Sequence, residues 1–558
     1  MTSRHLFWPA LAVLLSIAAV TEFRSAGGET QTWDEGIHIS AGYSYLKFGD
    51  FTWNVEHPPL AKMMSALPLM FMGLHAERLD TEGKRKDQVA YGVDFLYKNR
   101  LHADTILMAA RTPNILLTLL FTLAVALWTR RRWGPVGGLA AATLCALDPN
   151  LIAHGRYVTT DYPVTAFYFF ACVLWVEYLE SGGWKRLLAA ALAIALALIT
   201  KFSAILLPPS LALLYLICWI RRPREFPLRR LAAAAGTVAS TVLVFVMAIY
   251  WPETLRCLRG GVPLIYKIVN RNNLIGELLF EAGRKLALPA HAYLLGLNHV
   301  AEHNAGGHES YLLGIRSTTG WWYYFPVVFA VKSTLAALLA LAIVLAAGVR
   351  QAWRWEWPSP MAFGLALPPV MYFAFSMTSG LNIGMRHILP VYPFLYVGLA
   401  AWLSQSKSWR APVIVLAGVV ALQMAECARI APDYLAFFNE AAGGPGRGPE
   451  YLVDSNIDWG QDVKKLGLWL DRHAGSRRAR VFYFGNAQMR YYGIDEMGFP
   501  EPMDQKGWDA VDELCVVNVT PLQGVYVPLN ALARIRMREP VAKIGWSMYV
   551  YDLRKGRH

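Results

Sequence analysis

Charged residues are scarce in this chain. Asp, Glu, Lys and Arg together make up 17% of its 558 residues, whereas 55% are hydrophobic and the mean hydropathy is +0.31. This composition excludes a soluble enzyme and predicts an integral membrane protein. Cysteine is scarce too, with six residues, of which Cys145, Cys172, Cys218 and Cys427 fall within or at the end of hydrophobic segments. A thiol in such a segment acts as a small apolar side chain, so cysteine carries no functional signal here.

Long hydrophobic segments recur along most of the chain. We predict about eleven membrane-spanning helices, some of them shorter than the ~20 residues that cross a bilayer upright. They are Leu6–Val20, Ile106–Trp128, Val136–Ile152, Pro163–Leu179, Leu187–Thr200, Ala204–Ile220, Leu231–Trp251, Tyr323–Ala347, Ala362–Met377, Ile388–Leu403 and Pro412–Ala428. The predicted fold class is therefore mainly α.

Basic residues gather in alternate connections between these segments. The connections hold Arg130 to Arg132, Lys185 and Arg186, Arg221 to Arg230, Arg350 and Arg354, and Lys407 and Arg410. Because Lys and Arg concentrate in cytoplasmic loops, we expect the N-terminus in the cytoplasm and the C-terminus outside. The same loops face anionic headgroups and account for the net charge of +13, so the basicity does not indicate a nucleic-acid partner.

We expect a transmembrane domain over residues 1–430 with two long external loops, at 21–103 and 252–322. Hydrophobicity falls beyond residue 430, and residues 431–558 are predicted to form a small external α/β domain. Its predicted elements are two buried strands, Arg480–Phe484 and Leu514–Val519, and an amphipathic helix, Gln461–His473.

The predicted external segments hold most of the unusual ionisable residues. The first loop carries Asp34 and Glu35, then His57 and Lys62 at the start of an interfacial helix. Further candidates are Arg156 and Asp161 between two spans, Lys201 at a span boundary, His308 in the second long loop, and Arg386 with His387 as a cation pair. Lys332 lies inside a predicted span, where it should face a polar cavity or a carboxylate.

Two patterns resemble metal sites. His299 and His303 are four residues apart and could ligate a metal on a helix, but the sequence is not HExxH, and hydrogen-bonded loop histidines are the preferred interpretation. The segment from Asp454 to Asp458 resembles the start of a calcium loop. Trp459 and Lys465 replace the glycine and the glutamate that such a loop needs, which excludes an EF-hand.

Several motifs together resemble one family. Asp34-Glu35, His57-Pro58-Pro59-Leu60-Ala61-Lys62, His154 to Pro163 and Thr200-Lys201 look like the polytopic C-type glycosyltransferases that use lipid-phosphate sugars. The likeness is to the protein O-mannosyltransferase and aminoarabinose-transferase group. The segments Gly307–Gly314, Gly320–Pro326 and Asp454–Gln461 resemble prokaryotic, carrier-dependent members. The chain shows no recognisable β-trefoil insertion between its spans, which puts a protein acceptor in doubt.

The resemblance implies roles for the candidate residues. Asp34 would be the catalytic base, with Glu35 or Asp161 orienting the acceptor or supporting Asp34. Lys201, Arg386 and His387 would hold the donor phosphate, with Lys62 and Arg156 as further cations and His57 and His308 in the substrate site. A phosphate leaving group needs charge stabilisation, and the acceptor hydroxyl needs a base, so this set is the minimal machinery.

The predicted activity is transfer of a sugar, with inversion, from a polyprenyl-phosphate carrier to a hydroxyl of a lipid, glycan or protein at the external face of the inner (cytoplasmic) membrane. The alternative is a transporter or flippase of an anionic lipid-linked sugar, which needs the cations but no base. A receptor-like module would leave the charges unexplained. No cofactor is expected: a divalent metal at Asp34 and Glu35 is an alternative, but the surrounding cations disfavour it.

Overall fold

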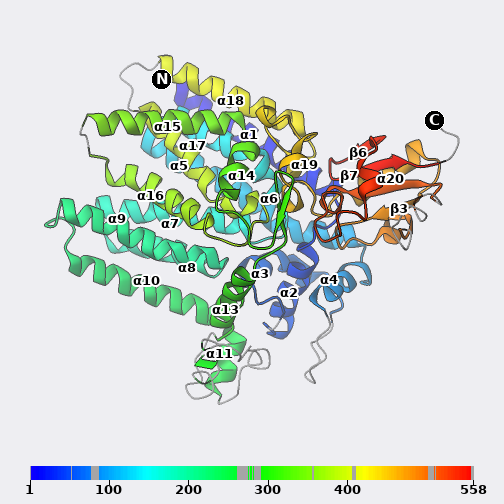
Figure 1. Cartoon of the computed structure of the whole chain (residues 1–558). Helices are drawn as coiled ribbons and strands as arrows, with labels where there is room; N and C mark the ends of the chain where they lie inside the picture. Colours follow the sequence, from blue (N-terminus) through cyan, green and yellow to red (C-terminus); the bar gives the residue numbers. More distant parts are fainter. Residues whose placement is uncertain are drawn as a thin grey trace.

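The protein was analysed as a computed structural model (Figure 1). The structure describes residues 2–51, 53–76, 87–259, 291–354, 357–404, 410–499 and 511–554, and the single positions 274, 277, 278, 281 and 508. Parts of the two long loops expected at 21–103 and 252–322, and the basic residue Lys407, therefore lie outside the described residues. Most of the described chain is helical, with a small sheet near the C-terminus.

Among the described residues, seven helical segments are long and apolar enough to cross a membrane. They belong to α1 (Thr2–Gly28), α5 (Ala103–Ala146), α7 (Asp161–Ser181), η2 and α9 (Phe202–Leu206 and Leu207–Arg221), α10 (Leu228–Ile249), α15 (Leu335–Trp353) and α18 (Arg410–Ile430). Shorter apolar helices are α8 (Trp184–Leu198), α16 (Pro360–Ser376) and α17 (Val391–Ser404). A mainly α, polytopic membrane protein is thereby confirmed.

The predicted spans fall on these helices, with two differences. Helix α5 is 44 residues long and contains one predicted span and most of a second, Val136–Ile152, whose end lies in α6 (Pro149–Gly155); a kink at Trp133 and Gly134, with φ +84° at Gly134, separates the two spans before Pro135. The predicted span Tyr323–Ala347 is divided between α14 (Tyr324–Lys332) and α15, with Thr334 as the N-cap of the second helix. Proline following a left-handed glycine ends one helix and begins the next, which explains the first difference.

Burial distinguishes central helices from peripheral ones. In the most apolar 18-residue stretch of α7, 83% of the residues are buried inside the protein, whereas only 11% are buried in the corresponding stretch of α10. The ring of Phe121 in α5 packs edge-on against that of Phe169 in α7, and both belong, with Tyr168 of α7, to one large hydrophobic cluster. Helix α7 therefore lies at the centre of the bundle, and α10 presents most of its surface outward, as a lipid-facing helix does.

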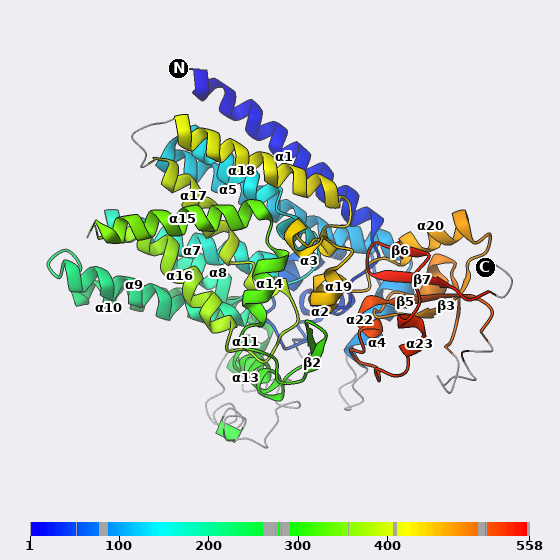
Figure 2. The ribbon, with the colours of Figure 1, turned by 45° about the horizontal axis from the view of Figure 1, so that its top comes forward.

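Short helices occupy the connections between the long ones. These short helices are α2 (Glu35–Phe48), α3 (Leu60–Ala66), η1 (Pro68–Phe71), α4 (Gln88–Tyr97), α6 (Pro149–Gly155), α11 (Trp251–Leu258), α13 (His291–Gly306) and η4 (Met385–Ile388). Helices α2 and α4 lie between the bundle and the C-terminal sheet, and α11 and α13 lie below the bundle in Figures 1 and 2. A two-stranded antiparallel hairpin, β1 (Ser310–Leu312) and β2 (Ile315–Ser317), follows α13.

The C-terminal part contains a five-stranded sheet in the order β4-β3-β5-β7-β6. Its strands are β3 (Arg478–Phe482), β4 (Asp495–Met497), β5 (Leu514–Asn518), β6 (Ala542–Ile544) and β7 (Met548–Asp552). Strand β3 is parallel to β4 and β5, and β7 is antiparallel to β5 and β6. Four helices and four 3-10 turns complete the described C-terminal part. The helices are α19 (Gly448–Tyr451), α20 (Val463–His473), α22 (Val519–Leu522) and α23 (Ala533–Arg536). The turns are η5 (Tyr434–Ala436), η6 (Glu440–Ala442), η7 (Asp454–Asn456) and η8 (Met489–Tyr492). The two strands and the helix expected here are confirmed to within two residues, and the domain boundary at residue 430 stays a prediction.

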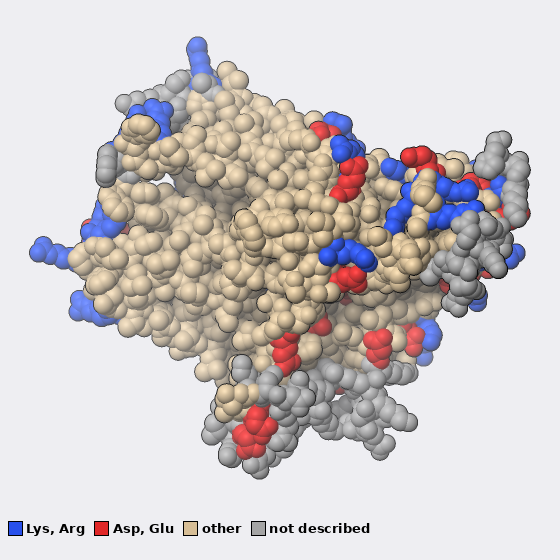
Figure 3. Space-filling view, in the orientation of Figure 1, with Lys and Arg blue, Asp and Glu red and all other residues tan. Residues whose placement is uncertain are grey.

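Surface charge is uneven along the bundle. Figure 3 shows Lys and Arg at the left end, where α9 and α10 are joined, and an uncharged belt beside them. Acidic and basic side chains reappear together on the right, over the C-terminal part. The N-terminus and the C-terminus lie at opposite ends of the molecule (Figure 2). This distribution is the one expected of a multi-pass membrane protein; which end faces the cytoplasm stays a prediction.

Candidate active site

Four charged side chains from separate elements form one ion-pair chain. Nη1 of Arg386 lies 2.7 Å from Oδ2 of Asp34 and 3.9 Å from Oδ2 of Asp161, and Lys201 pairs with the other oxygen of Asp161. The Asp34 side chain is 25% exposed, whereas those of Arg386, Lys201 and Asp161 are 12% exposed or less. The structure therefore brings these four predicted residues together, with Asp34 as the carboxylate open to a substrate.

Each of these residues lies at the end of a helix or in a break between helices. Asp34 precedes α2 and Asp161 begins α7. Lys201 has an extended backbone between α8 and η2. Arg386 lies in η4, a turn that begins directly after Gly384, whose φ is +145°. Helix ends leave backbone groups unpaired and turn side chains out of the bundle, so several ends can converge on one polar site.

A segment of the C-terminal part holds this site together. The backbone N–H of Trp33 donates to the carbonyl of Trp459 at 2.9 Å, and that of Met385 donates to Oδ1 of Asn456 at 3.0 Å. The Trp459 ring lies under the Arg386 guanidinium, 4.4 Å from its central carbon, a cation–π contact. The segment from Asn456 to Trp459 thus positions both the Asp34 loop and the Arg386 turn.

Three buried histidines surround the ion-pair chain. Burial, together with nearby Lys201, lowers the pKa of His57 and of His387 well below the ordinary value, and burial beside Lys62 also lowers the pKa of His38. These shifts disfavour a positive charge on the three imidazoles, and the expected Arg386–His387 cation pair stays a prediction. His38 was not predicted, although its place four residues after Asp34, one helical turn away, is a signal that could have identified it.

Several buried polar atoms of residues around the ion-pair chain are unpaired. Nε of Arg386, Nε2 of His387 and Nδ1 of His57 have no hydrogen-bond partner within the described part of the chain. Buried donors are normally satisfied, and exceptions call for a functional explanation. An anionic ligand between these groups would satisfy them.

Glu35 lies in a different environment from its neighbour Asp34. Both of its carboxylate oxygens bind Arg111, at 2.8 and 2.6 Å, and both side chains are fully buried. The same oxygens accept the backbone N–H groups of Thr32 and Val158. Every lone pair that Glu35 can use is thus taken by the protein, and this carboxylate fixes the Asp34 loop to α5 and to the segment after α6.

Two predicted cations, Arg156 and Lys62, are also held inside the protein. Arg156 forms two hydrogen bonds of 2.8 and 3.0 Å from Nη2 to Glu29 and is fully buried. Lys62, expected to be near the phosphate, is buried and donates to the carbonyls of Asn54 and His57, at 2.6 and 2.8 Å. The contacts of these two cations are therefore with the protein itself. They orient the neighbouring backbone.

Lys332 was expected to face a polar cavity or a carboxylate, and its hydrogen bonds are to backbone carbonyls. Its ammonium donates to the backbone carbonyls of Leu435 and Asn456, at 2.9 and 2.6 Å. It also lies over the Phe438 ring at 4.6 Å from the centroid. The lysine is the last residue of α14, and its hydrogen bonds join this helix end to η5 and η7.

His308 lies within electrostatic reach of Asp34 and contacts residues of the C-terminal part. Its Nε2 is 2.9 Å from the hydroxyl of Tyr526, which also donates to Oδ2 of Asp454 at 3.1 Å. The backbone N–H of Tyr526 donates to Glu309 at 3.1 Å. The sequence placed Asp454 in a false calcium motif and in a segment that resembles carrier-dependent members, but it indicated no role for Asp454 and no signal for Tyr526, because their proximity depends on tertiary structure.

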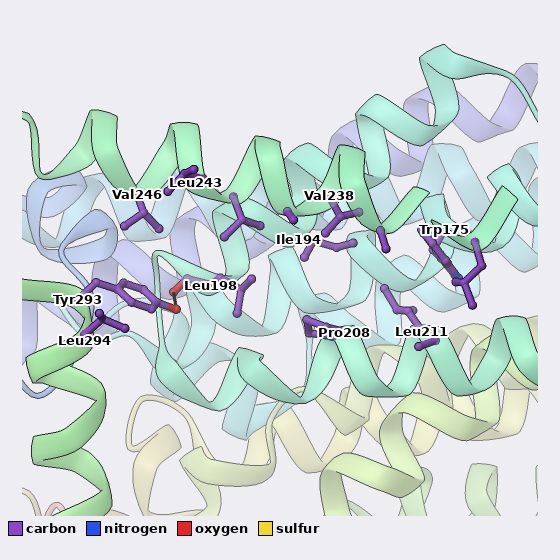
Figure 4. Close-up of a pocket in the computed structure, with 15 residues that line it drawn as sticks. Trp175, Ile194, Leu198, Pro208, Leu211, Val238, Leu243, Val246, Tyr293 and Leu294 are labelled. Atoms are coloured by element: carbon purple, nitrogen blue, oxygen red, sulfur yellow. Dashed lines mark hydrogen bonds between the residues drawn. The ribbon is translucent and has the colours of Figure 1, made fainter. Parts of the chain in front are cut away.

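An apolar groove of about 570 Å³ lies among α7, α8, α9 and α10 (Figure 4). Its lining includes Trp175, Ile194, Leu198, Pro208, Leu211, Val238, Leu243, Val246, Tyr293 and Leu294. At one end, the hydroxyl of Tyr293 donates to the carbonyl of Leu198 at 3.2 Å, and its ring packs on Phe202 at 5.1 Å. Lys201 lies between Leu198 and Phe202 in the chain, so this end of the groove adjoins the ion-pair chain.

Comparison with known proteins gives one family match. Residues 101–251 match the family model described as dolichyl-phosphate-mannose-protein mannosyltransferase, PMT_2. The resemblance drawn from the motifs is confirmed over this stretch. The matched stretch contains Arg111, Arg156, Asp161 and Lys201, and the match supports a glycosyltransferase. No curated protein sequence matches the chain.

Solved structures also resemble the fold. ArnT from Cupriavidus metallidurans bound to undecaprenyl phosphate is 14% identical, with a TM-score of 0.47 and 97% of each chain covered. Its apo form is 16% identical, with a TM-score of 0.46 and the same coverage. The archaeal oligosaccharyltransferase AglB from Archaeoglobus fulgidus, in complex with an inhibitory peptide and a dolichol-phosphate, is 10% identical with a TM-score of 0.48, over 95% of this chain and 72% of that one.

Proposed function

We propose that the protein is an inverting glycosyltransferase that moves a sugar from a polyprenyl-phosphate carrier to an acceptor hydroxyl at the external face of the cytoplasmic membrane. One observation carries the proposal: an apolar groove on the bundle ends beside Lys201, in an ion-pair chain whose outer member is a partly exposed carboxylate, Asp34. A groove for an isoprenoid chain, cations for a phosphate and a base for a hydroxyl are the parts that this reaction needs.

The cations serve the donor. The polyprenyl chain would occupy the groove among α7 to α10, and its phosphate would lie between Lys201 and Arg386. The unpaired Nε of Arg386 and Nε2 of His387 supply further donors for phosphate oxygens. Charge-assisted hydrogen bonds of this kind stabilise the negative charge that grows on the leaving phosphate.

Asp34 serves the acceptor. As the acceptor oxygen attacks the anomeric carbon, Asp34 takes the hydroxyl proton, and the bond between that carbon and the phosphate oxygen breaks to release polyprenyl phosphate. Attack opposite the leaving group inverts the anomeric configuration. Ion pairing with Arg386 orients the Asp34 carboxylate before the substrate arrives. In the same scheme, Asp161 positions Lys201 and Arg386. The loops around this ion-pair chain are positioned by three buried residues, Glu35, Lys62 and Arg156.

Asp34→Asn is the decisive variant, because it preserves shape and removes the base. We expect transfer to fall by about 100-fold or more, which is the usual contribution of a positioned base. Binding of undecaprenyl phosphate to the protein in nanodiscs should remain near the parent value. Lys201→Ala is the complementary variant and should weaken that binding. Near-normal transfer by Asp34→Asn would contradict the assignment, and a flippase, which needs no base, would show unimpaired transport in this variant.

We further propose that transfer needs no divalent metal. Asp34 and Asp161 are already paired with Arg386 and Lys201, and a divalent ion between the carboxylates would meet these cations at close range. Transfer measured after EDTA treatment should therefore equal that of the untreated enzyme. Loss of activity on chelation, followed by recovery with Mg²⁺ or Mn²⁺, would show that the carboxylates bind a metal.

A further inference from the structure

A second polar cluster lies outside the ion-pair chain of Asp34, Arg386, Asp161 and Lys201. Tyr526, Asp454 and His308 are linked through the Tyr526 hydroxyl, which lies 2.9 Å from the histidine and 3.1 Å from the carboxylate. They come from the loop after α22, from η7 and from the segment before β1. Three elements far apart in the chain thus supply one polar cluster. Because the Tyr526 side chain remains 42% exposed, a ligand can reach it.

Backbone strain is concentrated at two of these residues. Asp454 has φ +58° and Tyr526 has φ +62°, the left-handed region that favours glycine. Aspartate tolerates this conformation, but a bulky tyrosine adopts it rarely, at a cost of about 1–3 kcal/mol. Two strained residues in direct hydrogen-bond contact indicate a site whose side-chain positions matter more than local stability.

An aromatic stack connects the cluster to the proposed base. The rings of Tyr526 and Phe484 lie 5.5 Å apart at 13°, and those of Phe484 and Trp33 lie 5.2 Å apart at 20°. Trp33 directly precedes Asp34. The stack therefore forms one wall from the cluster to the carboxylate, and Asn486 fixes it by donating to the Trp33 carbonyl at 3.0 Å.

The electrostatics of the cluster oppose those of the donor site. Asp454 and Glu309 both contact Tyr526, and Asp34 lies nearby, so carboxylates predominate on this side. Burial raises the pKa of Asp454 to about 6, with Arg386 lowering it and Asp34 raising it, which shows that the cluster is within electrostatic reach of the ion-pair chain. A negatively charged acceptor would be repelled here.

We propose that Asp454, Tyr526 and His308 form the acceptor subsite and that the acceptor is a neutral carbohydrate, one of whose hydroxyls reaches Asp34. The inference rests on the proposed function, which it extends by naming the acceptor class. The hydroxyls of a sugar can form hydrogen bonds with a carboxylate, a phenol and an imidazole, and the apolar face of its ring can pack on an aromatic wall. Small-molecule sites commonly combine a few polar groups with such an aromatic lining.

Saturation-transfer NMR on the full chain in nanodiscs tests the proposal. The probes are mannotriose, cellotriose and chitotriose, a peptide containing Ser and Thr, and undecaprenyl phosphate for the donor site. We expect a trisaccharide to bind, and Tyr526→Ala and Asp454→Asn to weaken that binding by about 10-fold or more, the effect of losing hydrogen bonds to a charged group. Tyr526→Phe, which keeps the ring, should weaken it less. Met537→Ala, at a highly exposed side chain of the same C-terminal part, is the control and should match the parent.

Each other outcome overturns the inference. Binding of the peptide without any trisaccharide would assign a protein acceptor, and trisaccharide binding that survives both substitutions would place the acceptor elsewhere. Absence of binding by every trisaccharide would also contradict it. The undecaprenyl phosphate measurement separates the two proposals: if the parent and Tyr526→Ala bind this lipid equally and Lys201→Ala does not, the donor site stands even where the acceptor subsite fails.

Discussion

Asp34 and Glu35 are neighbours in the chain, yet their carboxylates have different surroundings. Asp34 is partly exposed and pairs with Arg386 at 2.7 Å, whereas Glu35 and Arg111 are buried completely. A buried carboxylate with every oxygen bonded inside the protein is poorly placed to accept a proton from a substrate. At the scale of the residue, the pair thus divides into a candidate base and a structural anchor.

Glu35→Ala should therefore act on stability. Arg111 would keep a buried charge with no counter-charge beside it, and breaking such a pair costs about 3–5 kcal/mol. We expect a lower melting temperature and less folded protein in detergent. Thermal unfolding of the purified protein is the measurement. Glu450→Ala is the control, because its pair with Arg447 is exposed on both sides and should contribute almost nothing. A Glu35→Ala protein that melts like the parent but transfers no sugar would show that Glu35 acts in the chemistry.

At the scale of the element, the turn η4 and the segment around η7 act as one unit. Hydroxyl Oγ of Ser455 donates to the carbonyl of Ile383, and Asn456 accepts from Met385. Gly384 lies between these contacts with φ +145°, and a Cβ added there would stand 2.5 Å from Oγ of Ser455. Any side chain at position 384 would displace the turn that presents Arg386.

Gly384→Ala should for this reason reduce transfer without touching a charged group. A displacement of about 1 Å at a positioned group costs up to about 100-fold in rate, so we expect a loss of about 10- to 100-fold. Steady-state transfer and undecaprenyl phosphate binding are the measurements. Gly418→Ala in α18 is the matched control, since an added Cβ there meets nothing within 4 Å. Parent-like rates for both variants would contradict the proposed role of the turn.

At the scale of the whole molecule, the distribution of basic residues predicts the orientation in the membrane. Arg221, Arg222 and Arg224 are exposed in the connection between α9 and α10, at the opposite end from the C-terminal sheet in Figure 1. The active-site elements lie toward the sheet. If basic loops face the cytoplasm, the candidate site faces outward, where a carrier-linked sugar would be used.

Thiol labelling in intact cells checks this orientation. In a Cys257→Ser background, with the remaining cysteines buried, Arg224→Cys should be protected from a membrane-impermeant reagent, and Ala441→Cys should react. Both positions are exposed, so any difference in labelling reports the side of the membrane. The reverse pattern would place the site in the cytoplasm and contradict the proposed function at the external face.

Much of the architecture could be predicted from the sequence, because hydrophobic runs and the positions of Lys and Arg are local properties. The predicted spans lie on helices, and the strands Arg480–Phe484 and Leu514–Val519 correspond to β3 and β5. Hydropathy did not reveal the kink inside α5 or the break after Lys332, because both depend on single residues in otherwise apolar segments. Short contiguous motifs likewise made Asp34, Asp161 and Lys201 candidates, and the pair of basic residues at 386 and 387 made Arg386 one.

Tertiary structure decided which of these ionisable residues share a site. Asp34 and Arg386 are 352 positions apart and meet only because the Asn456–Trp459 segment holds both of their loops. The sequence places Glu35, Lys62 and Arg156 in the same polar motifs as the site residues, but folding buries them against Arg111, backbone carbonyls and Glu29. A sequence shows the charge of a side chain; its solvent exposure and its partners, which determine whether that charge can act on a substrate, exist only after the chain has folded.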